Sequence, residues 1–206
     1  ARRSKHDALL TTLATTTRSE IGAVTTAGRV LRFSPVDIPS VPPASVQLGA
    51  GVRIRDYLGI TDKSEQVVAL VRFDDDTPLA LGTREGVVKR VVPSAMAVRP
   101  ELEIIALKKG DRVVGAGSAP DNAELVFVTS DTQLLHYSAS AVRPQGAPAG
   151  GMAGIKLATG AEVVSFAVVT DVEAAQVVTV SGSDGLLAGT DPGRAKISAL
   201  SEFPAK

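Results

Sequence analysis

The sequence predicts an all-β protein, a propeller-like array of four-stranded blades. A short phrase, in which a turn residue is followed by an apolar strand, occurs four times, with its turn residue at Gly28, Gly86, Thr132 and Gly185. These residues are 58, 46 and 53 positions apart, and the Val pairs that begin at positions 67, 113 and 163 are 46 and 50 apart. Repetition at about 50 residues is typical of propellers, solenoids and arrays. A β-sandwich is the alternative, but it would not explain the repetition.

Composition agrees with this fold class and narrows the kinds of protein. Of the 206 residues, 44% are hydrophobic but only 3% are aromatic, so that Val, Leu, Ile and Ala form the apolar mass. Val and Thr favour strands. The absence of Cys excludes disulfides and thiolate metal sites, and it fits a reducing cytoplasm. No apolar run approaches the ~20 residues of a membrane-spanning helix. Twenty-two cations balance 22 anions, so the net charge neither indicates nor excludes a polyanionic partner.

The first part of the chain is expected to hold a partial blade over residues 1–19 and a complete blade over about 20–73. The complete blade begins with a hairpin at residues 21–33, whose turn contains Gly28. Glycine tolerates the positive φ that such turns require. Its remaining strands are expected at 52–57, where apolar and polar residues alternate, and at 66–73, which is rich in Val.

Two more complete blades and a second partial blade are expected to follow. The complete blades cover about residues 77–120 and 123–170, and each closes with a strand that contains a Val pair, at 111–116 and 159–164. The partial blade covers residues 176–206 and stops before its last two strands. All the blades together form one domain over residues 1–206, which we expect to be a fragment of a longer protein or array.

No catalytic or metal-binding pattern stands out. His6 and His136 are far apart, and neither has a Ser, Asp or Glu constellation beside it, although a triad could still assemble in the fold. The carboxylates at residues 74–76, Asp121 and Asp184 lie in predicted turns, where Asp usually accepts hydrogen bonds from the local backbone. We therefore predict no catalysis, no metal and no cofactor in this segment.

The cations of the repeated hairpins form the candidate binding site. Because each copy makes the same hairpin, equivalent positions should fall on equivalent faces of successive blades. The fourth position after the turn and its neighbours hold Arg29, Arg32, Arg84, Lys89, Arg90 and His136. This pattern predicts an interrupted basic belt along one rim, which could hold a phosphodiester backbone without reading its sequence. His136 is expected to face solvent or a ligand there. The alternative is that these are ordinary solvated strand residues, balanced by acids.

Three phrases of the sequence carry a family resemblance. They are Thr83-Arg-Glu-Gly-Val-Val-Lys-Arg90, Lys109-Gly-Asp-Arg-Val-Val114, and Arg143-Pro-Gln-Gly followed by Gly151-Met-Ala-Gly-Ile-Lys-Leu157. Together they resemble the blades of the C-terminal domain of bacterial type IIA DNA topoisomerase A subunits, in gyrase and topoisomerase IV. The resemblance extends over essentially the whole chain. It implies a β-pinwheel, a propeller-like ring whose blades exchange strands with their neighbours.

The resemblance also implies a function and partners. Domains of this family bind and bend duplex DNA around a basic rim and present it to the catalytic core. The parent protein would be an ATP-dependent, cytoplasmic topoisomerase with no membrane association. Its protein partners would be the ATPase B subunit and the catalytic core of the same A subunit. The phosphate contacts are expected at Arg2, Arg3, Lys5, Arg29, Arg32, Arg84, Lys89, Arg90, Arg143, Lys156, Arg194 and Lys196.

One departure from the family pattern concerns a loop. Gyrase A subunits carry a basic, Gly-rich box on which DNA wrapping depends, whereas residues 145–154 keep a Gln and the glycines but have no cation. Fewer phosphate contacts lower both the affinity and its salt dependence. We therefore expect weaker bending than gyrase-type wrapping, as in topoisomerase IV or in a gyrase A subunit from which the part with the box has been cut. The alternative function is a propeller-like protein-interaction module, which would show weak salt dependence and an apolar patch.

Overall fold

The turn residues of the repeat adopt the left-handed backbone conformation that tight hairpins require. Gly28 and Gly86 have φ values of 75° and 80°, and Thr132 has a φ of 67°. The strands on both sides of each turn pair antiparallel, which confirms these three hairpins. The fourth turn, at Gly185, lies outside the residues that the computed structural model describes, which are 10–38, 40, 52–73, 76–96, 99–181 and 194–206.

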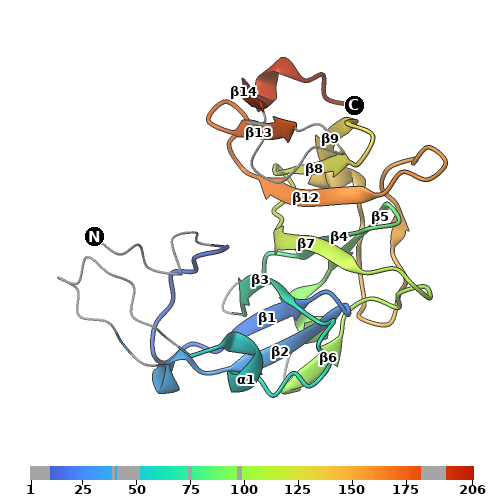
Figure 1. Ribbon diagram of the computed structural model, residues 1–206. Coiled ribbons are helices and arrows are strands. Elements are labelled where there is room, and N and C mark those ends of the chain that lie inside the picture. Colours follow the sequence, from blue (N-terminus) through green and yellow to red (C-terminus); the bar gives the residue numbers. More distant parts are fainter. Residues whose placement is uncertain (1–9, 39, 41–51, 74–75, 97–98, 182–193) are drawn as a thin grey trace, which may run out of the picture.

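The first blade is a four-stranded sheet that takes one strand from the next repeat (Figure 1). Its order is β3-β1-β2-β6. Strand β6, which follows the second hairpin in the sequence, pairs antiparallel with β2. The strands are β1 (Ile21–Thr25), β2 (Arg29–Phe33), β3 (Val67–Arg72) and β6 (Glu101–Glu103). This exchange of strands between neighbours is the one that the family resemblance implied.

The strand predicted at residues 52–57 is wrong, because Ile54–Tyr57 form the short helix α1. Strand β6 occupies the place beside β2, which leaves this segment outside the sheet. The Tyr57 ring instead meets the Phe33 ring edge to face at 5.7 Å, and the Tyr57 hydroxyl donates to the Ser34 carbonyl at 3.2 Å. Alternation over so short a segment did not separate a strand from a single helical turn.

The second blade repeats this arrangement with an interrupted exchange strand. Its order is β10-β5-β4-β7, and β11 also pairs with β5. Both β10 and β11 come from the third repeat, and β10 is parallel to β5 whereas β11 is antiparallel to it. The strands are β4 (Leu79–Thr83), β5 (Val87–Val91), β7 (Val113–Ser118), β10 (Pro144–Gln145) and β11 (Met152–Ala153).

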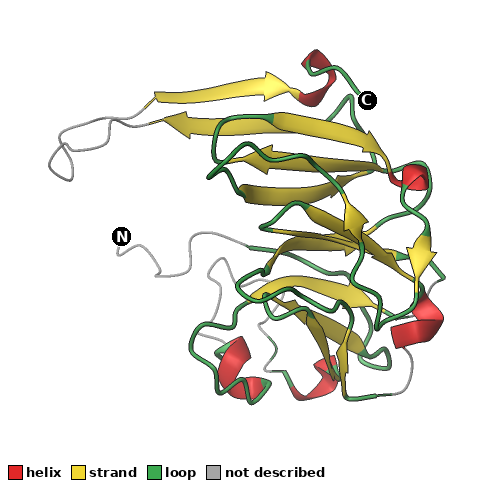
Figure 2. Ribbon diagram, turned by 90° about the vertical axis from the view of Figure 1, so that its right-hand side faces the viewer, coloured by secondary structure: helices red, strands yellow, loops and turns green. Residues whose placement is uncertain are grey.

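The third blade and a further hairpin complete the described fold. The third blade has the order β12-β8-β9, with β8 (Glu124–Thr129), β9 (Leu134–Ser138) and β12 (Val163–Val169). The further hairpin, which we call the fourth hairpin, pairs β13 (Gln176–Ser181) with β14 (Arg194–Ala199). Strands β3, β7 and β12 begin at the three Val pairs, so the closing strands predicted at 111–116 and 159–164 start later and extend further than expected. Figure 2 shows the sheets following one another as a stack of layers.

A short 3-10 helix follows the second strand of every hairpin, which extends the repeat beyond the strands. The helix begins one or two residues after the strand ends. These helices are η1 (Pro35–Asp37), η2 (Pro93–Met96), η3 (Ala139–Ala141) and η4 (Leu200–Glu202). At three of them, η2, η3 and η4, a side chain of the preceding blade donates a hydrogen bond to a backbone carbonyl in the helix or directly after it.

The hydrophobic cores lie between successive blades. One cluster joins the first and second blades through Val71, Leu81 and Ile104, all buried. Another joins the second and third blades through Val88, Phe127 and Phe166. The Phe127 and Phe166 rings meet edge to face at 4.9 Å. Each blade thus depends on its neighbour to cover its apolar face, as in other repeat proteins.

Candidate nucleic-acid interface

The cations at the fourth position after each turn lie between blades rather than on an open rim. Arg90 is 1% exposed and His136 is 3% exposed, while Arg32 is half-buried. We call Arg32, Arg90 and His136 the latch residues, because each donates to a carbonyl in or directly after the 3-10 helix of the following repeat. The predicted exposure of Arg90 and His136 is therefore wrong.

Arg90 shows the latch in its most complete form. Its guanidinium donates to the carbonyl oxygens of Ala139 at 3.0 Å and Val142 at 3.1 Å, which begin and cap η3. It also donates to the Ala119 carbonyl at 2.8 Å and to the Asp121 carboxylate at 2.7 Å. Both terminal nitrogens are thus occupied, and a side chain this buried cannot contact a phosphate without leaving its place between the blades.

Arg32 and His136 make the equivalent contacts at the other two boundaries. Arg32 donates to the Met96 carbonyl at the end of η2, at 3.0 Å, and to Glu20 at 2.5 Å, and its guanidinium lies 4.1 Å from the centre of the Phe73 ring. The His136 Nε2 atom lies 3.0 Å from the Phe203 carbonyl oxygen, directly after η4. The latch is thus repeated at three successive boundaries.

Lys89 is also buried, on the opposite side of β5 from Arg90. It is 0% exposed, and its ammonium donates to the carbonyls of Ile104 at 2.8 Å, Ala147 at 2.7 Å and Ala149 at 2.6 Å. The last two carbonyls belong to residues 146–151, the loop between β10 and β11, which therefore closes around the ammonium. Buried charges in proteins are usually paired or hydrogen-bonded to internal groups, and the Lys89 ammonium has three such partners. The predicted role of Lys89 as an exposed phosphate contact is therefore wrong.

We expect the stability that Lys89 confers to depend on pH. Burial lowers the pKa of Lys89 to about 8 from its ordinary value of 10.5. Between these values the unfolded chain binds more protons than the folded one, so the free energy of unfolding should rise with pH there, by at most ~1.4 kcal/mol per unit. Urea denaturation from pH 7 to 10 at constant ionic strength measures this, with Lys89→Met as the variant that lacks the group. A stability difference between the two proteins that stays flat over this range would contradict it.

Arg29 is held by two carboxylates at the turn end of the first blade. Its Nε and one terminal nitrogen donate to the two Glu65 carboxylate oxygens, both at 2.6 Å, and the other terminal nitrogen pairs with Glu101. The Arg29 guanidinium holds the pKa of the Glu65 carboxyl below its ordinary value. A phosphate would have to compete with both carboxylates for this side chain.

Exposed cations gather instead around the Glu85–Gly86 turn of the second blade. Arg84 donates to the Gly110 carbonyl at 2.9 Å, and the Glu85 amide donates to Asp111 at 3.0 Å. The Ile155 amide donates to the Gly86 carbonyl at 3.1 Å. These bonds bring three segments together at one turn. We call the cations on them the blade-2 basic cluster: Arg84, which is half-buried, and the exposed Lys108, Lys109, Arg112 and Lys156.

The blade-2 basic cluster has no equal at the turn ends of the neighbouring blades. In the third blade, residues 130–133 and 158–162, all of them described, hold two acids and no cation. In the first blade Lys63 is exposed, but Arg29 is paired with carboxylates. Sequence reasoning named Arg84 and Lys156 but missed Lys108, Lys109 and Arg112. The signal for these three was the basic turn directly before the Val pair at 113.

The other predicted contacts are not gathered at one place. Arg143 is exposed but lies beside β10, at the end of β5 that is remote from the turn. Arg194 and Lys196 are exposed on β14 of the fourth hairpin. Arg2, Arg3 and Lys5 lie outside the described residues.

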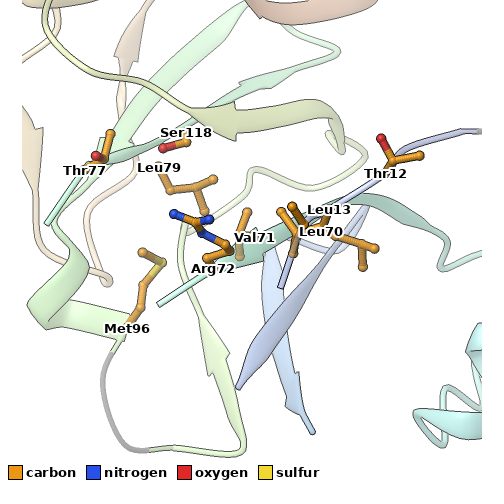
Figure 3. A pocket seen from close by; sticks show the side chains of 10 residues that line it. Thr12, Leu13, Leu70, Val71, Arg72, Thr77, Leu79, Met96 and Ser118 are labelled. Carbon is orange, nitrogen blue, oxygen red and sulfur yellow. The ribbon is translucent and has the colours of Figure 1, made fainter. Parts of the chain in front are cut away.

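A cavity of about 300 Å³ lies beside the first blade (Figure 3). Apolar side chains such as Leu70 and Met96 line it, with Arg72 and the hydroxyls of Thr12, Thr77 and Ser118. These described lining residues include no carboxylate, His or Lys. Over the described part of the chain, no cluster of three His, Cys, Asp or Glu could hold a metal ion. No helix in that part is long and apolar enough to span a membrane.

Comparisons with known proteins agree on one kind of domain. Residues 123–170 match the family model described as DNA gyrase C-terminal domain, beta-propeller. The crystal structure of the C-terminal domain of DNA topoisomerase IV superposes with a TM-score of 0.79 at 23% identity, over 100% of this chain and 61% of that one. This chain folds as a β-pinwheel of the gyrase and topoisomerase IV type. The structure of the E. coli ParC C-terminal domain superposes on the pinwheel with a TM-score of 0.60 at 16% identity, over 89% of this chain and 82% of that one.

Curated relatives confirm the resemblance. The pinwheel is 27% identical over 186 residues to the DNA gyrase A subunit of Mycobacterium tuberculosis (strain CDC 1551 / Oshkosh), which covers 87% of this chain and 20% of that protein. It is 22% identical over 213 aligned positions to the DNA gyrase A subunit of Escherichia coli (strain K12), which covers 100% of this chain and 22% of that protein. The chain thus spans about a fifth of the length of these relatives.

Proposed function

We propose that the pinwheel binds and bends duplex DNA without reading its sequence, and that the blade-2 basic cluster is its main contact. The observation that carries this proposal is the convergence of five cations, four of them exposed, on a single turn. Two acids, Glu85 and Asp111, lie on the same segments, and Glu162 of the third blade pairs with Arg84 at 3.4 Å, which still leaves an excess of positive charge. The similarity to gyrase A subunits and to topoisomerase IV supports the same function.

The chemistry of the cluster favours phosphates over bases. Lys and Arg side chains on turns contact the backbone of a duplex, release its counterions and carry no sequence information. Because the turn end of the third blade is acidic, we expect the duplex to run from the second blade toward Lys63 of the first. A contact over two blades gives weaker bending than a full wrap.

We further propose that the whole protein is the A subunit of an ATP-dependent, cytoplasmic type IIA DNA topoisomerase. This segment would present DNA to the catalytic core of the same protein, and the ATPase B subunit would be the second protein partner. No catalytic step is assigned to the segment itself. The names of the curated relatives and the shared fold support this proposal.

Removing the exposed cluster cations should weaken DNA binding and make it less dependent on salt. Each lost phosphate contact lowers the slope of log K against log salt by ~0.9, so a quadruple variant should lose about 3 to 4 from the slope and at least about tenfold in affinity. The measurement is fluorescence anisotropy with a labelled duplex of random sequence, across a salt series. The variant is Lys108→Ala/Lys109→Ala/Arg112→Ala/Lys156→Ala, in which Arg84 is kept because it fixes the turn.

The matched control removes cations at the other end of a hairpin. Arg18 and Arg99 are exposed and lie close to the open end of the first hairpin, next to Glu20 and Pro100. The variant Arg18→Ala/Arg99→Ala should bind almost as the wild type does. Equal losses in both variants would contradict the assignment of the cluster. Absence of binding at low salt by folded wild type would contradict DNA binding itself and favour a protein-interaction role.

A further inference from the structure

We infer that His136 is a pH-sensitive latch, which holds the C-terminal segment against the third blade when the imidazole is protonated and releases it when the proton is lost. The segment concerned is η4 and the residues that follow it, up to Lys206. Figure 1 shows this end of the chain beside β9. The first and second boundaries between blades have arginine at the same position and should not respond.

Both ring nitrogens of His136 face oxygen atoms that accept hydrogen bonds. Nδ1 lies 3.0 Å from a Glu124 carboxylate oxygen, and Nε2 lies 3.0 Å from the Phe203 carbonyl oxygen. A backbone carbonyl only accepts, and so does an ionised carboxylate, so the two bonds form together only when both nitrogens carry a proton. Imidazolium satisfies both bonds. Neutral imidazole has one N–H, so one of the two bonds is lost and a lone pair faces an oxygen beside a ring that is only 3% exposed.

The comparison with the other two latch residues shows what is special about this boundary. Arg32 and Arg90 are permanently charged, because a guanidinium does not lose its proton in proteins. Histidine is the side chain that changes charge between pH 5 and 8. The third boundary therefore depends on protonation at a position where the first two do not.

The charged groups on the elements around His136 do not remove this dependence. Strand β8 contributes Glu124, and the C-terminal segment contributes Glu202 and Lys206. The Lys206 amide donates to the His136 carbonyl at 3.1 Å, a backbone bond that holds the segment together with the ring and is expected to open more often when the ring contact is lost. Tyr137, next to His136 on β9, stays neutral, since burial raises the pKa of its hydroxyl to about 12.

Release of the latch would open an apolar hollow. A space of about 490 Å³ between the third blade and the fourth hairpin is lined by Val126, Leu134, Val178, Leu200 and Phe203, among others. Leu200 and Phe203 belong to the segment that His136 holds. Loss of the Phe203 contact therefore loosens one wall of this hollow and the attachment of the fourth hairpin.

Amide hydrogen exchange, detected by mass spectrometry, tests the latch on three proteins. They are the wild type, His136→Arg and His136→Gln, compared at pH 5.5 and 8.5 after correction for the intrinsic exchange rates. In the wild type, protection of residues 200–206 should fall about tenfold at the higher pH, the scale of one hydrogen bond to a charged group. His136→Arg should keep its protection at both pH values, and His136→Gln should lack it at both. Strands β1 and β2 are the internal reference.

Two results would overturn the inference. One is equal protection of residues 200–206 in the wild type at both pH values. The other is an equal fall in the wild type and in His136→Arg, which would assign the response to another group. If His136→Arg does not fold, the wild type and His136→Gln are sufficient for the test. The protection of residues 200–206 in the wild type must then be close to that in His136→Gln at pH 8.5 and higher than it at pH 5.5. NMR of the ring nitrogens, in a chain with two His, then checks that loss of the proton accompanies loss of protection.

Discussion

Arg90→Ala should lower the free energy of unfolding by about 3 to 5 kcal/mol, the range for removing one partner of a buried charged network. The side chain is buried and donates to three carbonyls, those of Ala119, Ala139 and Val142. Truncation leaves these acceptors without a donor and leaves a cavity between the second and third blades. Each unsatisfied buried acceptor costs about 1 to 3 kcal/mol. Urea denaturation followed by far-ultraviolet circular dichroism measures the loss.

Two control variants separate the latch from ordinary surface charge. Asp121 is 80% exposed, so Asp121→Ala should cost less than about 1 kcal/mol even though it removes the ion pair with Arg90. Arg143→Ala removes an exposed arginine and should cost about 0.5 kcal/mol or less. Below the melting temperature, folded Arg90→Ala should bind DNA as the wild type does. A marked loss of DNA affinity with unchanged stability would contradict the latch and restore Arg90 to the binding surface.

The hairpins could be predicted from sequence because their determinants are local. A turn residue that tolerates positive φ, with apolar strands on either side, fixes both the pairing and the register, and Gly28 and Gly86 show this directly. The Val pairs also predicted that β3, β7 and β12 exist, although the last two begin later than the predicted strands at 111–116 and 159–164. The partner of β2 could not be found in this way. It is β6, more than 70 residues later, and its pairing is decided by the packing of two blades rather than by any local pattern.

The cations illustrate a second limit. The repeat predicted that Lys89 and Arg90 lie in a strand. It did not predict whether other elements cover the two faces of that strand, which decides whether the side chains are exposed. Alternation sends the two side chains to opposite faces of β5, and both faces are covered, one by η3 and the other by residues 146–151. Valine on both sides, at positions 87, 88, 91 and 92, was a sign of a strand buried on both faces. The blade-2 basic cluster required the turn contacts, which join segments from three parts of the chain.

Gly115→Ala should destabilise the pinwheel by about 3 kcal/mol, the upper part of the usual range for overpacking, or prevent folding. Gly115 lies on β7, and a Cβ atom there would come 2.1 Å from the backbone oxygen of Phe166 on β12. A side chain could rotate away from such a contact, but a strand held by its own ladder to β8 cannot. Strand β12 would have to move away from β7, and this would disturb the packing of the Phe166 ring on Gly82 and Phe127.

The same strand supplies a matched control for this prediction. At Gly117 an added Cβ would meet the Val168 side chain at 3.2 Å, a contact that a small rotation relieves, so Gly117→Ala should change the free energy of unfolding by about 1 kcal/mol or less. Urea denaturation of both variants gives the comparison. Equal stabilities would mean that β7 and β12 can separate at little cost. A large loss confined to Gly115→Ala would show that the spacing between the second and third blades depends on the missing side chain at this one position, while the latch residues hold the blades at their edges.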